Sequence, residues 1–123
     1  MADTVDELDV CCPDPGPSLL EVNVATRLGE MFKALADPTR VRLLAYLAAS
    51  ESGTACACHL PAALGISQPT MSFHMRKLVD AGLVSREKRG RWMHYAVLPE
   101  ALDDLRGYLQ ARSEALAGRS GCC

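Results

Sequence analysis

Around Gly65 the sequence carries two short helical patterns in immediate succession. The first is predicted to begin at Thr54, a suitable N-cap, and to run through Leu64, with Gly65 ending it in the left-handed conformation. The second begins at the N-cap Ser67 and is stopped by Gly82. Its apolar side chains recur at helical spacing, at Met71, Met75, Leu78 and Val79. Two short helices joined by a tight glycine-containing turn predict a helix-turn-helix.

The period of the apolar pattern changes directly after these helices. Residues 83–88 and 91–97 have the character of two strands, and the letters KRGR form the turn between them. Gly90 supplies the positive φ that such a turn requires, so a β-hairpin, or wing, is expected. A helix-turn-helix followed by a hairpin predicts a winged helix-turn-helix, which is a mainly α fold of the α+β class.

Further helical patterns flank this winged unit. One covers about residues 19–36, and another covers 38–49 behind the N-cap Asp37 and the N1 proline Pro38. A last helix opens at Pro99 and places its leucines on one side, at Leu102, Leu105, Leu109 and Leu116.

The first and last helices lie outside the compact unit, so their apolar stripes need a partner surface. A second copy of the chain is the simplest partner, which predicts N- and C-terminal dimerisation helices. We expect a flexible Cys-containing arm over 1–18, a winged-helix DNA-binding and dimerisation domain over 19–118, and a flexible Cys-containing tail over 119–123.

The second helix of the helix-turn-helix presents polar side chains opposite its apolar stripe. An exposed first turn with an amide and hydroxyls can read base edges in the major groove, whereas lysine and arginine further along suit phosphates. Arginines at the wing tip can reach the backbone or the minor groove. The predicted DNA-contacting residues are Gln68, Thr70, Ser72, Phe73, His74, Arg76, Lys77, Arg89 and Arg91. His74 lies at the edge of the stripe, where a packed histidine bonded to the backbone is an equal alternative.

Charge favours a polyanionic partner. The net charge is only −2, but residues 71–91 are rich in lysine and arginine, while residues 1–30 hold Arg27 as their single basic residue. The basic segment favours double-stranded DNA, although a solvated charged face is the alternative on charge alone.

No apolar run approaches the roughly 20 residues that span a bilayer, and the acidic N-terminus lacks a signal-peptide pattern. We therefore expect a cytoplasmic protein without a membrane partner, in which the six cysteines stay reduced.

The cysteine spacings exclude two classes of protein. A thiol oxidoreductase or arsenate reductase needs a CxxC or one activated cysteine in a βαβ context. A structural zinc protein shows paired C-x₂₋₄-C spacings. Here the cysteines occur as CC at 11–12, CxC at 56–58 and CC at 122–123. We therefore expect no enzyme and no small-molecule substrate.

The CxC pair raises a geometric question. Residues i and i+2 of a helix point to nearly opposite sides, so Cys56 and Cys58 cannot share one ion from an undistorted helix. They can do so at a frayed first turn or in an extended lead-in, where i and i+2 share a face. Cys56 lies four residues before Leu60 and can be partly core, whereas Cys58 is off the apolar stripe. Further thiols are therefore needed for a good site.

Several segments resemble one known family. ALADPTRVRLLAYL and LGISQPTMSFHMRKLVDAGLVSREKRGRWMHYAV are similar, in the right order, to the hallmark of the ArsR/SmtB family of bacterial metal-sensing repressors. The resemblance covers about residues 20–115. It implies a homodimeric winged-helix repressor that holds its operator when metal-free and is released by inducer. One family type carries ELCVCDL where this chain has TACACHL, so Cys56 and Cys58 match its thiols, while its third cysteine falls at Pro61.

The resemblance also implies where further ligands lie. Relatives with a cysteine pair in the N-terminal arm bring the arm of one subunit to this helix of the other, a role that Cys11 and Cys12 fit. Cys122 and Cys123 are expected to be auxiliary at most.

Thiolates without histidine select soft ions. Three match pyramidal As(III), and four match tetrahedral Cd(II). Adjacent cysteines in the arm, as in arsenite-sensing relatives, favour As(III) or Sb(III) as the inducer that derepresses a metalloid-resistance operon. The alternatives are a Cd(II)- or Pb(II)-sensing repressor and a thiol-redox sensor in which arm and helix cysteines form a disulfide.

Overall fold

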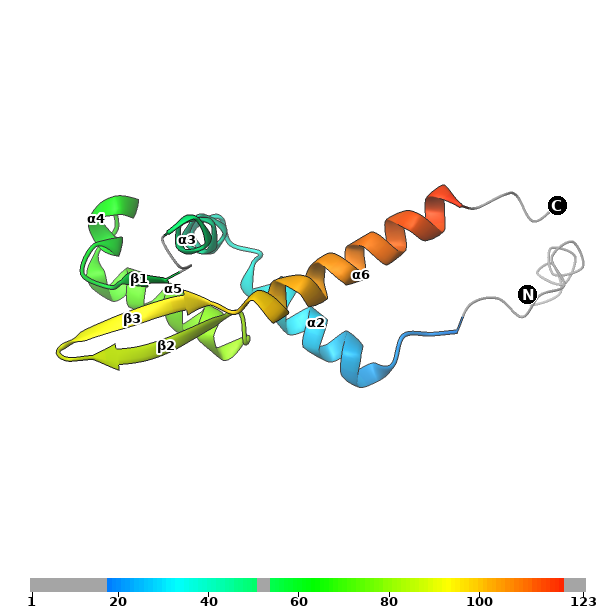
Figure 1. The fold of residues 1–123 in the computed structure, drawn as a ribbon, viewed down its shortest axis with the longest axis horizontal. Coiled ribbons are helices and arrows are strands. Elements are labelled where there is room, and N and C mark those ends of the chain that lie inside the picture. The colour runs from blue at the N-terminus through cyan, green and yellow to red at the C-terminus, as the bar shows by residue number, and fades with distance from the viewer. Residues whose placement is uncertain (1–17, 51–53, 119–123) are drawn as a thin grey trace, which may run out of the picture.

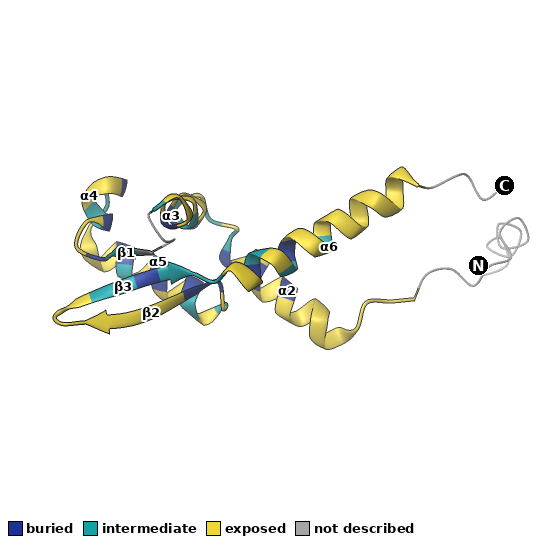
Figure 2. Cartoon of the chain, in the orientation of Figure 1, coloured by how far each residue is buried: buried dark blue, intermediate teal, exposed yellow. Residues whose placement is uncertain are grey.

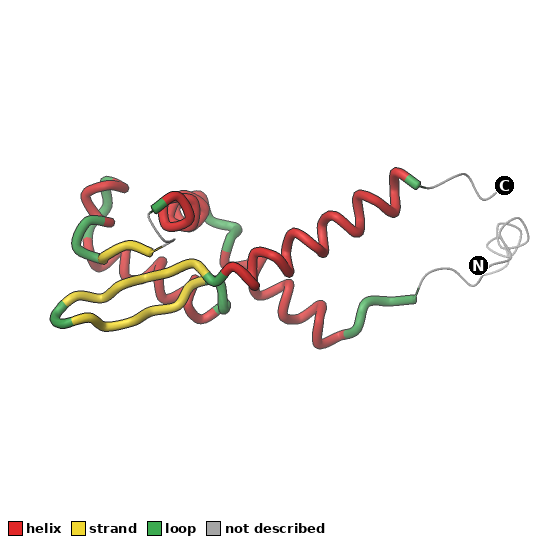
Figure 3. The backbone as a smooth tube through the Cα atoms, in the orientation of Figure 1, coloured by secondary structure: helices red, strands yellow, loops and turns green. Residues whose placement is uncertain are grey.

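The computed structural model describes residues 18–50 and 54–118, and over these ranges the fold is a winged helix-turn-helix. The helices are α2 (Val22–Ala34), α3 (Pro38–Ala49), α4 (Leu60–Leu64), α5 (Gln68–Asp80) and α6 (Pro99–Ala117). The strands are β1 (Thr54–Cys56), β2 (Val84–Arg89) and β3 (Trp92–Val97), which form one antiparallel sheet in the order β1-β3-β2. The winged unit lies at one end of the chain's long axis, and α2 and α6 extend from it (Figure 1). Figure 3 shows the long β2–β3 hairpin beside the short β1.

The helix starts follow from local capping, as the sequence predicted. The Asp37 carboxylate accepts hydrogen bonds from the backbone N–H groups of Thr39, at 2.8 Å, and Arg40, at 3.3 Å, where α3 begins. Ser67 accepts from the Thr70 N–H at 3.3 Å where α5 begins. Gly65 ends α4 with a φ of 69°, a left-handed conformation that suits a residue without a side chain.

The predicted helix over 54–64 is wrong in its first half. Thr54–Cys56 is a strand, and α4 begins only at Leu60, with Pro61 in its first turn. The strand pairs with β3 in the register Ala55 opposite Tyr95, and the Ala57 N–H donates to the Met93 carbonyl at 2.8 Å. These bonds satisfy backbone groups that a helix would otherwise use, so pairing with a distant strand overrides the capping preference of Thr54.

The core lies where the three inner helices meet the sheet. The predicted stripe of the second helix of the helix-turn-helix is confirmed, since Met71, Met75 and Leu78 are fully buried. Other fully buried side chains come from α3, α4 and the start of the wing, namely Leu43, Leu47, Leu60 and Leu83. This core fixes which side of α5 faces outward.

The outer parts of α2 and α6 are exposed along most of their length (Figure 2). The two helices touch near their crossing, where the Phe32 and Tyr108 rings pack edge to face at 5.8 Å and Arg27 forms an ion pair with Asp104. Apolar side chains beyond that contact lie open, with Leu109 53% exposed. No helix in the described residues is long and apolar enough to cross a membrane.

Candidate functional site

The outward face of α5 carries the residues predicted to read DNA. Gln68 and Thr70 are exposed in its first turn, and Ser72 is half-buried one turn further along. The Ser67 hydroxyl donates to the Thr70 hydroxyl oxygen at 2.9 Å, which leaves the Thr70 proton free to be donated outward. Proline in the first turn removes no helical hydrogen bond, because that N–H would have no partner in the helix. Amide and hydroxyl groups thus project from a rigid helix start, as direct base readout requires.

Basic and aromatic side chains follow on the same helix. Arg76 and Lys77 are exposed, and the Lys77 ammonium lies 5.4 Å from the centroid of the Phe73 ring. Phe73 is itself 48% exposed, which is unusual for so large an apolar group in a helix whose other face is core. The ring gives the lysine a cation–π contact and so holds the ammonium on the outward face.

His74 points toward α3. Its Nδ1 atom lies 3.1 Å from Nη1 of Arg40, and its ring packs edge to face with Phe73 at 5.4 Å. Its partner is therefore a side chain, whereas the sequence left open only a backbone group or DNA. A DNA contact for His74 stays a prediction.

Arg40 and His74 also act on Asp37, the cap of α3. Burial raises the pKa of the Asp37 carboxyl, but the hydrogen bonds from the backbone N–H groups of Arg40 and Thr39 act in the opposite direction. The positive charge of Arg40, and that of His74 whenever its ring is protonated, add to this lowering, and the pKa of Asp37 ends below its ordinary value. The cap is therefore ionised and strong at neutral pH.

The wing tip holds the other predicted DNA contacts. Arg89 donates from Nε and Nη2 to one Glu87 carboxylate oxygen, at 3.2 and 3.1 Å, and Arg91 is exposed at the turn beside Gly90, whose φ is 65°. Sequence reasoning missed Trp92, which pairs across the hairpin with Arg89 and is 45% exposed. The sequence signal for Trp92 is an aromatic residue directly after the basic KRGR turn.

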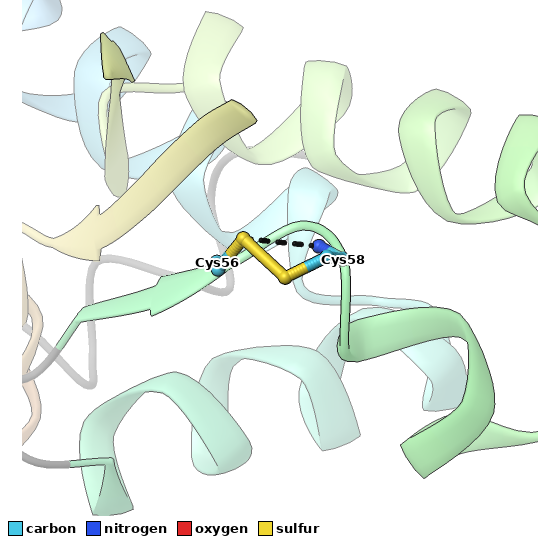
Figure 4. The surroundings of a disulfide bond; sticks show 2 residues. All are labelled: Cys56 and Cys58. Carbon is cyan, nitrogen blue, oxygen red and sulfur yellow. Dashed lines mark hydrogen bonds between the residues drawn. A yellow bond between two sulfur atoms is a disulfide. The ribbon is translucent and has the colours of Figure 1, made fainter. Parts of the chain in front are cut away.

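Cys56 and Cys58 lie side by side where a strand passes into a turn, rather than in a helix. Cys56 ends β1, Cys58 lies in the following turn, and their Cα atoms are 5.3 Å apart. The two sulfurs are joined in a disulfide, and the Cys58 N–H donates to the Cys56 sulfur at 3.3 Å (Figure 4). Cys58 is exposed and Cys56 half-buried, while the intervening Ala57 is buried. The strand end and the turn after it thus bring the two sulfurs together, and once the disulfide is reduced the two thiolates can share a ligand.

The strand that carries Cys56 is part of the wing sheet. Cys56 lies directly opposite His94 of β3, and His94 in turn lies opposite Glu87 of β2. Residues directly opposite in an antiparallel pair share a face of the sheet. Cys56 is therefore connected through the sheet to the central strand of the wing, and through the following turn to α4.

The remaining cysteines predicted as ligands lie outside the described residues: Cys11, Cys12, Cys122 and Cys123. Among residues 18–50 and 54–118, no group of three or more histidine, cysteine or acidic side chains is placed to hold a metal ion. Within these ranges the pair Cys56 and Cys58 supplies two sulfurs, and the need for further thiols stays a prediction.

Comparison with known proteins places these features in a family. Residues 37–86 match the profile described as bacterial regulatory protein, arsR family. A putative arsenical resistance operon repressor of Halobacterium salinarum is 39% identical over 84% of this chain and 89% of its own length. An arsenic resistance transcriptional regulator of Pseudomonas putida is 37% identical over 71% of this chain and 70% of its own.

A solved structure gives the same result. The crystal structure of the AntR antimony-specific transcriptional repressor superposes with a TM-score of 0.61 at 31% identity, covering 84% of this chain and 92% of that one. All three proteins are named as transcriptional regulators or repressors rather than as enzymes.

Proposed function

Because the chain belongs to the ArsR family of bacterial regulatory proteins, we propose that it is a homodimeric repressor whose cysteine thiolates bind As(III) or Sb(III). Binding releases the repressor from its operator and so derepresses a metalloid-resistance operon in the cytoplasm. The observation that carries the proposal is the placement of the Cys56 and Cys58 sulfurs together beside the DNA-reading unit.

The chemistry of the pair suits a trivalent metalloid. Thiolate is a soft ligand, and As(III) and Sb(III) form pyramidal complexes with three of them. Arsenous acid reacts with three thiols to form three As–S bonds and release three waters, so no oxidant is consumed. Cys56 and Cys58 supply two sulfurs, and Cys11 or Cys12 from the arm of the second protomer supplies the third. The arsenic and antimony named in the relatives support this choice of element.

The position of the pair offers a means of release. Cys56 ends a strand hydrogen-bonded to β3, and Cys58 lies just before α4, which supports α5 in the helix-turn-helix. Tying these residues to an arm of the other protomer biases the wing and the reading helix together. A coupling free energy of about 1–3 kcal/mol, the usual size for allostery, lowers operator affinity roughly 5- to 150-fold.

The apolar faces of α2 and α6 support the dimer. Val22, Val24 and Leu116 are exposed on these helices beyond the Phe32–Tyr108 contact. Burying such side chains against the same surface of a second copy removes their apolar area from water, in a two-fold symmetric interface. Two copies then present two α5 helices to successive turns of the operator.

Operator binding by fluorescence anisotropy tests the proposal. The reduced protein is titrated separately with As(III), Sb(III), Cd(II), Pb(II), Zn(II) and Hg(II). We expect As(III) and Sb(III) to release the DNA at the lowest concentrations. Release by Cd(II) or Pb(II) at lower concentrations than As(III) would instead assign the alternative divalent inducer, and no release by any of them would refute metal sensing.

The Cys56–Cys58 disulfide favours one second candidate, a thiol-redox sensor. In that case two thiols lose two electrons and two protons to hydrogen peroxide, which is reduced to two waters. The same titration with peroxide and without metalloid decides between them. Release by peroxide alone supports the redox sensor, and release by As(III) alone supports the metalloid sensor.

A further inference from the structure

One arginine side chain joins three helices behind the DNA-reading face. Arg40 lies near the start of α3 and is half-buried. Its Nε atom donates to the Ala34 carbonyl, in the last turn of α2, at 2.6 Å, and its Nη1 atom lies 3.1 Å from Nδ1 of His74 on α5. Its backbone N–H is held by the Asp37 carboxylate at 3.3 Å. The guanidinium is therefore fixed at both ends, between α2 and α5.

The bond to His74 defines the state of the imidazole. A guanidinium has donors only and stays protonated, so Nδ1 must accept, and the ring proton lies on Nε2. Lysine cannot replace this arrangement, because its single ammonium group lacks the planar guanidinium fork. That fork is the fixed pair of N–H directions from Nε and Nη1 that reaches the Ala34 carbonyl and His74 Nδ1 together.

His74 occupies a decisive place on α5. It follows Phe73, whose ring it contacts edge to face, and it precedes the buried Met75. The same short segment therefore meets the core, the α3 arginine and the outward aromatic ring that supports Lys77. The Arg40–His74 contact therefore links this segment of α5 to the last turn of α2.

We propose that Arg40 and His74 are positioning residues for operator binding, which set the angle of α5 relative to α2. Arg40 touches no DNA in this role, and His74 acts through Arg40. The inference rests on the proposed function in one respect: α2 belongs to the proposed dimer surface, so the bond transmits dimer geometry to the reading helix.

The test compares four single variants and one double variant in operator binding without inducer, each with its salt dependence. Arg40→Gln and His74→Leu break the bond, Arg40→Lys keeps the charge but loses the fork, and His74→Gln keeps an acceptor. We expect the first three to weaken operator affinity about fivefold or more, the factor that a coupling of ordinary size gives. His74→Gln should restore most of the affinity. The double variant Arg40→Gln with His74→Leu should lose little more than either single change, because both remove one bond.

The salt slope separates positioning from contact. A lost phosphate contact flattens the slope of log affinity against log salt by about 0.9. Arg42→Gln is the control, because it removes one positive charge from an exposed position on the same helix. We expect Arg40→Gln and Arg42→Gln to show the same slope. A flatter slope in Arg40→Gln alone would assign Arg40 to the DNA surface and overturn the proposal.

Two further outcomes also contradict it. If His74→Gln loses as much affinity as His74→Leu, the imidazole itself contacts DNA or serves another role. If Arg40→Lys binds as wild type, the fork is not needed. Arg40→Lys and His74→Gln are the mildest changes, so the test holds even if the others unfold. Because no inducer is present, failure of arsenite release would refute the proposed function and leave this inference standing.

Discussion

Removing Arg76 and Lys77 should change how operator binding depends on salt. Both side chains are exposed on α5, just beyond the aromatic ring of Phe73, where they can reach phosphates when the first turn of α5 enters the major groove. Phosphate contacts release condensed counterions, so their number is read from the slope of log affinity against log salt. The variant Arg76→Gln with Lys77→Gln removes both charges while keeping side chains of similar length.

The magnitude follows from the two-fold dimer. Two residues in each of two protomers give four contacts, and the slope should flatten by about 3.6, at about 0.9 per contact. Between 50 and 200 mM salt, the wild type should therefore lose about two orders of magnitude more affinity than the variant. Fluorescence anisotropy with a labelled operator at several salt concentrations measures both quantities.

Two controls accompany this measurement. Arg106→Gln removes a charge from α6, where Arg106 bonds Asp103 at 3.3 Å, and should leave the slope unchanged. Gln68→Ala should leave the slope unchanged but cost about 1–3 kcal/mol of discrimination at one base pair. An unchanged slope in the Arg76 and Lys77 variant would remove both residues from the interface and refute the orientation assigned to α5.

Three further predictions concern stability and coupling. Leu43→Ala in the core should lower the free energy of unfolding by about 2–5 kcal/mol, whereas Val41→Ala, half-exposed on the same helix, should change it by less than about 0.5 kcal/mol in urea unfolding. Because the folded-state pKa of Asp37 is lowered, its ionised form adds stability above the ordinary carboxyl pKa, and this is lost as pH falls through the folded value. Asp37→Asn should therefore be less stable than wild type in thermal unfolding at pH 7, and the difference should disappear once the pH lies well below the folded-state pKa of Asp37. A difference that persists in such acid would contradict the role of the carboxylate as the cap. Trp92 is the single tryptophan and lies in the wing. Arsenite binding should therefore change the protein's intrinsic fluorescence. An unchanged fluorescence at saturating arsenite would contradict a coupling between the thiol site and the wing.

Much of the fold is predictable because its signals are local. The caps Asp37 and Ser67 and the left-handed Gly65 act within a few residues of themselves, and the apolar stripe of α5 is a matter of helical spacing. The strand Thr54–Cys56 is different, because its hydrogen bonds come from β3, a partner far along the chain. Three residues carry too little pattern to reveal such a pairing.

The candidate site also combines features that local sequence signals predict with features that depend on distant residues. The sequence identifies Cys56 and Cys58 as a pair, but a helix would point them to nearly opposite sides. The observed strand end at Cys56 and the turn that holds Cys58 bring the two sulfurs together instead. The partner of His74 is equally hidden, since Arg40 lies 34 residues away and meets it only through the packing of α3 on α5. Chemistry-bearing residues are thus visible in the sequence, while their mutual geometry depends on tertiary packing.

The most direct test of the account is arsenite-driven release of the operator from reduced protein that carries Cys56→Ser and Cys58→Ser. The matched control carries Cys122→Ser and Cys123→Ser, and a third protein carries Cys11→Ser and Cys12→Ser. In fluorescence anisotropy, arsenite should release the operator from the wild type and the tail variant, and fail to release it from the other two at the same concentration. Release from the Cys56 and Cys58 variant at the wild-type arsenite concentration would contradict the assignment of these thiols to the inducer site.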